Sequence, residues 1–488
     1  MLTLMEVSKR QFVSGAIWKA LEQFGSKAIT MIVSIILARL LSPDDYGLLA
    51  LTAVFTSLAD VLIDGGMSTA LIRKREVSDG DYSAVFAISS ITAIILYAVL
   101  FVAAPYVANY YDSPILASVI RVMGLVFFIQ AFTVVRNGII NRNMQFKLLF
   151  RCNMISSIVS GVLGIVCAFV GIGVWALVVQ RLFQQAILTV LLLCRIQWKI
   201  KWRFDLSRIR EMLGFSIGVL GTSLLSYIGN NLYNVVIGKR LSVADVGYYE
   251  KGYQLPMQFS LYTFGAMSSV LLPTLSKSQD DMARFKRITR KVAGMTAFLV
   301  FPLMIIMLLC SKELICLLFT EKWLPSLRTM QIMALYYVTV PFLLLNTQVL
   351  YSLGRSGIRA RIEALRVSLI VFSVIAISLI VDANLEMFVI SNLIVAIAVL
   401  VASYLPVKKL LNYSVVEVIE DIGLPALFSI VLGVAAWLVG SALPAGGNLV
   451  LLCIKTSVGV FCYIVLSVLF RLPYIKELRG AFSRKRNE

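Results

Sequence analysis

Apolar stretches of about twenty residues recur along almost the whole chain, separated by short polar connections. A helix needs roughly this many apolar residues to cross the hydrocarbon core of a membrane. Composition agrees, because 59% of the 488 residues are hydrophobic, only 15% are charged and the mean hydropathy is +0.88. Soluble globular proteins do not tolerate so much apolar surface. The sequence therefore predicts an all-α polytopic membrane protein without an attached soluble domain.

Apolar windows bounded by Gly, Pro and charge predict about 14 transmembrane helices. They cover residues 15–40, 47–71, 83–108, 115–137, 150–170, 174–195, 213–237, 254–275, 292–311, 328–352, 365–381, 386–406, 422–442 and 450–470. The first window carries Lys19, Glu22 and Lys27, and no small-residue cleavage site follows it. It is therefore expected to be a retained helix rather than a signal peptide.

Lys and Arg are concentrated in one set of alternate connections, the set that includes both termini. The positive-inside rule then places both termini in the cytoplasm, which requires an even number of membrane-spanning helices. The net charge of +19 has the same explanation, since basic cytoplasmic loops lie beside anionic lipid. A nucleic-acid partner is not expected.

Several classes of active site are excluded by composition. The chain has no histidine, so His-based acid–base catalysis, His metal ligation and His proton relays are absent. The seven cysteines form no CxxC pair and no metal-binding spacing, and they are expected to be small buried hydrophobic residues. We therefore expect neither a metal site nor a resident cofactor.

A short motif is repeated at an offset of 200 residues. Arg39 to Gly47 reads RLLSPDDYG after the first predicted helix, and Lys239 to Gly247 reads KRLSVADVG after the seventh. Both helices are predicted to run in the same direction, so the repeat implies two parallel six-helix halves, as in alternating-access transporters. The expected parts are an N-terminal lobe over 1–200, a C-terminal lobe over 201–407, and two further helices with a basic tail over 408–488. A substrate site is expected in a central cavity between the lobes.

The segment from Ala38 to Ala50, followed by Asp64-Gly65-Gly66 and Ala70-Leu71-Ile72, resembles the amino-terminal signature of the polysaccharide transporter family. The resemblance is strongest to colanic-acid exporter-type and O-antigen (Wzx-type) flippases of the multidrug/oligosaccharidyl-lipid/polysaccharide exporter superfamily. It implies two lobes around a central cavity, alternating access, and a cargo of undecaprenyl-diphosphate-linked oligosaccharide. The resemblance also implies that glycosyltransferases and a polysaccharide polymerase act before and after the protein, which would itself be a transporter and not an enzyme.

Polar residues form one stripe on the first predicted helix and another on the second. The first stripe contains Lys19, Glu22, Gln23, Ser26, Lys27, Thr30 and Ser34 at spacings typical of one helix face, and the second contains Thr52, Thr56, Asp60 and Asp64. Central charges facing lipid would each oppose insertion by about 3 kcal/mol, so both stripes are expected to face protein or water. Lys27 is a plausible partner for Asp60. Asp64, beside two glycines, either belongs to an ion site or only ends its helix.

Further polar groups are predicted inside the membrane in both halves. Candidate contacts to the diphosphate and sugars of a lipid-linked glycan are Lys19, Lys27, Arg121, Arg181, Gln184, Asn230, Asn231 and Asn234. Candidates for coupling to a proton or sodium ion are Glu22, Asp60 and Asp64. The membrane potential is the alternative driving force, and the sequence does not decide between them.

Other functions were weighed on the same residues. A membrane glycosyltransferase or polymerase would need a sizeable outward loop with catalytic acids, whereas the outward connections are short. A multidrug exporter of small cations would need an acidic cavity, whereas Lys27, Arg121 and Arg181 favour an anionic cargo. A lipid II flippase remains a possibility within the flippase class.

Overall fold

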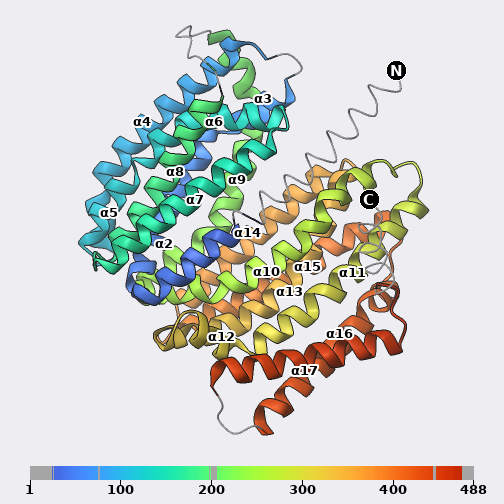
Figure 1. The fold of residues 1–488 in the computed structure, drawn as a ribbon. Coiled ribbons are helices and arrows are strands. Elements are labelled where there is room, and N and C mark those ends of the chain that lie inside the picture. Colours follow the sequence, from blue (N-terminus) through green and yellow to red (C-terminus); the bar gives the residue numbers. More distant parts are fainter. Residues whose placement is uncertain are drawn as a thin grey trace. The chain divides into compact units, whose positions relative to one another are not determined.

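The computed structural model describes residues 25, 27–74, 77–196, 198, 206–442 and 447–474. Throughout these residues the chain is helical apart from short connections, and none of them lies in a β-strand (Figure 1). Ten of the described helices are long and apolar enough to cross a membrane. The predicted all-α membrane fold is thus confirmed. The predicted number of fourteen spans is compatible with this structure and stays a prediction.

The chain divides into two compact units, Met1–Gly247 and Tyr248–Glu488. The first holds the helical residues 27–40, α2 (Pro43–Asp64), α3 (Met67–Arg73), α4 (Asp79–Tyr110), α5 (Ile115–Met123), α6 (Val126–Arg142), α7 (Phe146–Phe169), α8 (Val174–Arg195), α9 (Leu206–Arg240) and the start of α10 (Val243–Ser276). The second holds the rest of α10, α11 (Met282–Leu309), α12 (Ser311–Leu318), η1 (Glu321–Ser326), α13 (Leu327–Ser352), α14 (Ser356–Ser378), α15 (Leu385–Leu411), α16 (Val415–Ala442) and α17 (Asn448–Leu469). The predicted boundaries at 200 and 407 were drawn from the repeated motif and not from contacts between residues, and they stay predictions.

Two predicted spans are each broken into two helices. The span predicted at 47–71 is α2 followed by α3, because Gly65 and Gly66 adopt positive φ angles of 51° and 77°, a conformation that favours glycine. The span predicted at 115–137 is α5 followed by α6, with the break at Gly124. Helix α6 also continues to Arg142, beyond the predicted end at residue 137. The prediction stopped short because the last turn of α6 is polar and an apolar window does not include it.

The repeated motif forms the same N-terminal helix cap twice. Ser42 caps α2, with its Oγ accepting from the Asp45 backbone N–H while the Asp45 carboxylate accepts from the Ser42 N–H at 2.9 Å. At α10, the Ser242 Oγ accepts from the Asp245 N–H at 3.1 Å and donates to the Asp245 carboxylate at 2.6 Å. This reciprocal arrangement satisfies donors that a helix start leaves without partners. The Ser and Asp of the repeat are therefore explained by capping.

The glycines of the two motifs bring the two turns into direct contact. A Cβ atom added to Gly47 would lie 1.8 Å from the Val243 carbonyl oxygen, and one added to Gly247 would lie 2.1 Å from the Pro43 carbonyl oxygen. Each glycine thus faces the backbone at the start of the other helix. The repeat marks a reciprocal backbone contact that no residue with a side chain can make without displacement.

In the second unit, α16 and α17 pack along α11, as the red and yellow helices of Figure 1 show. Their apolar contact is built on Phe298 of α11, Phe428 and Leu432 of α16, and Tyr463 of α17. The Tyr463 hydroxyl donates to the Phe298 carbonyl oxygen at 2.8 Å. Nearer the start of α17, Lys455 forms a buried ion pair with Glu313 of α12 at 2.5 Å. Lys455 is thus held by protein.

We expect Gly47→Ala and Gly247→Ala to lower the melting temperature of the purified protein. Backbone atoms cannot rotate away from an added methyl group. Each substitution should therefore lower the free energy of unfolding by about 1–3 kcal/mol or more. Gly221→Ala is the control, because no atom lies within 4 Å of its Cβ position and alanine is the better helix former. Equal melting temperatures for the Gly47 variant and the parent would show that the two turns are not in contact.

Removal of one partner of the buried pair should destabilise the protein more than removal of both. Lys455→Met leaves a buried, unpaired Glu313 carboxylate and should lower the unfolding free energy by about 3–5 kcal/mol, with a smaller loss for Lys455→Met/Glu313→Leu. Unfolding in mixed micelles measures both losses. The control is Lys312→Met, an exposed neighbour. Additive losses in the double variant would contradict the pairing.

Candidate functional site

The first unit gathers four helical segments around the predicted polar stripes. Val33 and Leu37 of the segment 27–40 pack against Ala168 of α7 and Leu177 of α8. Helix α7 approaches closely, since a Cβ on Gly161 would lie 2.5 Å from a Val33 methyl group. Helix α2 contacts α8 as well. Side chains from the segment 27–40, α2, α7 and α8 therefore belong to one bundle.

Lys27 lies at the start of the described part of this bundle. It is exposed, and no described residue forms a hydrogen bond or ion pair with its ammonium group. The neighbouring candidates Lys19 and Glu22 lie outside the described residues, and their predicted roles stay predictions. Lys27 is thus accessible to solvent or to a bound group.

Asp60 lies on α2 and Arg181 on α8, two helices that pack against each other. One carboxylate oxygen of Asp60 is buried and has no hydrogen-bond partner in the described part of the chain. Arg181 is the charged residue that acts on Asp60 electrostatically, while its own side chain is exposed. The expected pairing of Asp60 with Lys27 stays a prediction.

Asp64 ends α2. Its carboxylate accepts from the Gly66 backbone N–H at 3.2 Å and from the Ser68 hydroxyl at 2.5 Å. These contacts span the break between α2 and α3. Of the two roles considered for Asp64, the structure thus displays the helix-ending one, and a role in ion coupling stays a prediction.

Arg121 of α5 lies on an aromatic ring of α4. Its guanidinium carbon is 4.3 Å from the centroid of the Phe101 ring, and its Nε donates to the Phe101 carbonyl oxygen at 3.3 Å. A cation over a ring face is attracted by the ring quadrupole. Arg121 therefore already has partners, in contrast to Lys27.

Hydrogen bonds within the bundle are seen for two of the candidate amides. The Gln184 amide donates to the Ser157 hydroxyl of α7 at 3.2 Å, and the Asn231 amide donates to the Tyr227 carbonyl oxygen at 3.0 Å. Asn234 is buried and Asn230 is exposed. Gln184 thus forms a hydrogen bond between helices, and Asn231 forms one along its own helix. Their predicted sugar contacts stay untested.

Two buried cations are not among the predicted site residues. Arg136 lies near the end of the predicted span 115–137, and Lys251 precedes the predicted span 254–275. Arg136 of α6 is 2% exposed, donates to the Phe132 carbonyl oxygen at 2.7 Å and lies over the Trp198 ring. Lys251 of α10 is 3% exposed and donates to the Gln254 amide oxygen at 3.1 Å. Extending the span predicted at 254–275 back to Val243 would have placed Lys251 within a helix. The described residues include no group of three or more His, Cys, Asp or Glu that could hold a metal ion.

Comparisons with known proteins agree with this architecture. The succinoglycan biosynthesis transport protein ExoT of Rhizobium meliloti is 24% identical over 65% of this chain and 64% of its own length. The lipopolysaccharide biosynthesis protein WzxC of Escherichia coli is 23% identical over 67% of this chain and 66% of its own length. Among solved structures, the lipid II flippase MurJ in an inward closed conformation superposes with a TM-score of 0.76 at 16% identity, covering 94% of this chain and all of MurJ.

These similarities confirm a multi-pass transporter fold and the predicted assignment to a transporter rather than an enzyme. The family model described as polysaccharide biosynthesis protein matches residues 36–328, which is more than half of the chain and includes both copies of the repeated motif. The predicted family is thus confirmed: the protein belongs to the polysaccharide biosynthesis protein family.

Proposed function

We propose that the protein is a flippase that moves undecaprenyl-diphosphate-linked oligosaccharide repeat units from the cytoplasmic to the outer leaflet of a bacterial inner membrane. The repeat units would serve the biosynthesis of a surface polysaccharide such as O-antigen, capsule or exopolysaccharide. The concentration of Lys and Arg in alternate connections supports an orientation with both termini in the cytoplasm. Glycosyltransferases would supply the cargo and a polymerase would consume it.

One observation carries this proposal: two cations of membrane-embedded helices remain accessible. Lys27 and Arg181 are both exposed, although a charge facing lipid at the centre of a span opposes insertion by about 3 kcal/mol. Such groups are retained where they face water or an anionic ligand. A diphosphate carries about two negative charges and accepts hydrogen bonds from ammonium and guanidinium groups.

The rest of the cargo is matched by neutral polar groups. Sugar hydroxyls both donate and accept, so amides such as Gln184 and Asn230 can contact them. The lipid tail can stay in the bilayer while the head group crosses. No bond is made or broken, and alternation between inward-open and outward-open states would complete the transfer.

The membrane potential supplies a sufficient driving force for this cargo. Moving about two negative charges out of a negative cytoplasm gains roughly 4 to 5 kcal/mol per 100 mV. We propose that Asp60 serves as a counter-charge to Arg181 rather than as an ion-coupling site, since Arg181 is the charge that acts on it.

The first test is the sidedness of lipid-linked repeat units in cells. Lys27→Gln and Arg181→Gln should each cause repeat units to accumulate in the cytoplasmic leaflet, because the diphosphate loses a charge-assisted contact of about 1.5–3 kcal/mol. Arg195→Gln is the matched control, since it removes the same charge from the exposed C-terminal end of the same helix α8. Protein abundance must be equal in all strains.

Normal arrival of repeat units at the outer leaflet in both variants would overturn the cationic site while leaving the family intact. An equal defect in Arg195→Gln would show that any loss of positive charge on α8 suffices, and that Arg181 has no special role.

The second test concerns the driving force, in proteoliposomes without a proton or sodium gradient. An imposed potential of 100 mV should favour the outer leaflet by up to about a thousandfold at equilibrium, for the parent and for Asp60→Asn alike. A strict requirement for a proton or sodium gradient that disappears in Asp60→Asn would instead assign ion coupling to this carboxylate.

A further inference from the structure

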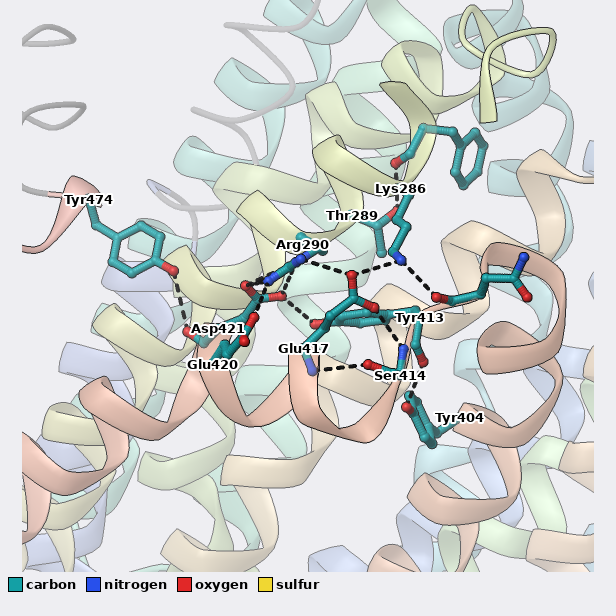
Figure 2. Close-up of polar contacts among 12 residues, drawn as sticks. Lys286, Thr289, Arg290, Tyr404, Tyr413, Ser414, Glu417, Glu420, Asp421 and Tyr474 are labelled. Atoms are coloured by element: carbon teal, nitrogen blue, oxygen red, sulfur yellow. Dashed lines mark hydrogen bonds and ion pairs between the residues drawn. The ribbon is translucent and has the colours of Figure 1, made fainter. Parts of the chain in front are cut away.

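An ionic cluster in the second unit joins two helices (Figure 2). The Arg290 guanidinium of α11 contacts three carboxylates of α16, those of Glu417 at 2.9 Å, Glu420 at 3.1 Å and Asp421 at 2.9 Å. The Tyr413 hydroxyl also donates to the Asp421 carboxylate at 2.7 Å. These contacts attach α16 to α11, and the cluster therefore serves the fold.

A pocket of different character lies in the first unit, where the ends of three helices meet. It has a volume of about 380 Å³ and lies between the start of α2, the residues that follow α4 and the turn between α9 and α10. Its polar lining includes Asp44, Tyr111, Asp112, Ser113, Lys239 and Ser242. Small-molecule sites occupy roughly 300–1,000 Å³, so the pocket is large enough for a small polar ligand.

The pocket lies at the level of a membrane surface. Asp44 is the second residue of the candidate span Pro43–Leu71, and Asp112 follows the candidate span Asp79–Tyr110. The connections that form the pocket belong to the alternate set that is poorer in Lys and Arg. The positive-inside rule assigns this set to the outer surface of the membrane, which is where the proposed cargo arrives.

Two aspartates contribute exposed carboxylates to the pocket. Asp44 is exposed, and its side chain forms no hydrogen bond or ion pair with a residue that the structure describes. The Asp112 side chain is 86% exposed, and its carboxylate lies 3.3 Å from the Lys239 ammonium nitrogen. A carboxylate can accept about four hydrogen bonds. Both groups can therefore accept from a ligand.

Lys239 supplies a donor at the same place. Its ammonium nitrogen donates to the Tyr110 carbonyl oxygen at 2.6 Å and lies 4.8 Å from the centroid of the Tyr110 ring. Its side chain is still 37% exposed. An ammonium group has three hydrogens, and the Tyr110 carbonyl and the Asp112 carboxylate use two of them. One hydrogen is thus left to donate to a ligand.

The lining is held in shape by contacts within the first unit. The Tyr111 ring is buried, and its hydroxyl donates to the Val235 carbonyl oxygen at 3.2 Å. Val243, which also lines the pocket, is the residue whose carbonyl oxygen faces Gly47. A site that is already ordered lowers the entropic cost of binding. The pocket is therefore formed before a ligand enters it.

The lining favours a ligand that both donates and accepts hydrogen bonds. Two exposed carboxylates oppose an anion such as free phosphate, and a metal ion at Asp112 would face the Lys239 ammonium group. Sugar hydroxyls donate to carboxylates and accept from ammonium groups. The carbon-bound hydrogens of a sugar ring can also pack on an aromatic ring such as that of Tyr111. The chemistry of the pocket thus matches a glycan.

We propose that this pocket binds sugar residues of the repeat unit at the outer surface of the membrane, after the head group has crossed. Asp44 and Asp112 accept hydrogen bonds from sugar hydroxyls, and Lys239 donates one. The inference rests on the proposed function, which supplies the glycan and its direction of travel. The pocket is separate from the diphosphate contact, since Lys27 lies at the start of the segment 27–40 and Asp44 follows its end.

The test measures binding of a soluble oligosaccharide to the purified full-length protein by isothermal titration calorimetry. The probe is the oligosaccharide that mild acid releases from the lipid-linked repeat units of the producing cells, and it carries neither diphosphate nor lipid. Asp44→Asn and Asp112→Asn should each weaken binding about tenfold, because a neutral amide makes no charge-assisted hydrogen bond. Asparagine also tolerates the positive φ of 53° at residue 112.

The matched control is Asp382→Asn, which removes an exposed carboxylate from the connection between α14 and α15. It should bind the oligosaccharide as the parent does. Asp112→Asn keeps the proposal testable if Asp44→Asn, which alters the first turn of α2, does not fold.

Equal affinities for the parent and both pocket variants would overturn the proposal, and so would an equal loss in Asp382→Asn. Calcium that binds the parent, displaces the oligosaccharide and is lost in Asp44→Asn would assign the pocket to a metal ion instead. The sidedness of lipid-linked repeat units in the same cells separates the two proposals. Delivery to the outer leaflet by a parent protein that does not bind the oligosaccharide refutes the pocket alone, whereas absence of delivery refutes the proposed function and with it the identity of the ligand.

Discussion

A charged side chain inside a membrane helix needs a counter-charge, a hydrogen-bond acceptor or access to water, and this requirement organises the polar residues of the structure. Lys455 forms an ion pair with Glu313. Arg136 donates to a carbonyl oxygen and lies over the Trp198 ring, and Lys251 donates to Gln254. These three cations are therefore accounted for by the fold. Lys27 and Arg181 remain exposed, and this difference separates candidate binding residues from structural ones.

The repeated motif shows how a short sequence can encode a contact between distant helices. Its Ser and Asp cap α2 and α10 locally, and its glycine allows the two capped ends to meet backbone to backbone. Both requirements operate at residues 42–47 and again at 242–247. Because the same five-residue spacing serves the cap and the contact, the motif can persist while the helices around it diverge.

The sequence was sufficient to predict helices, membrane insertion and family, because apolar length and the repeated motif are local properties. It was insufficient for the surroundings of individual side chains: Arg181 acts electrostatically on Asp60, and this influence depends on the packing of α8 against α2. Lys251 lay outside the predicted span 254–275, because an apolar window omits the polar first turns of α10, which begins at Val243. The partners of Glu313 and Arg290 lie more than 120 residues away, and no spacing rule links them.

Helices α16 and α17 show why such distant partners matter in a membrane. Lipid surrounds their apolar faces as readily as protein does, so apolar contact alone gives little preference for one helix arrangement. Here the apolar contact of Phe298 with Phe428 and Tyr463 lies between two ionic attachments. Arg290 holds the first turns of α16, and Glu313, just beyond the other end of α11, holds α17 through Lys455. Two charged contacts at opposite ends fix both the height and the rotation of the helix pair, which neither contact could do alone.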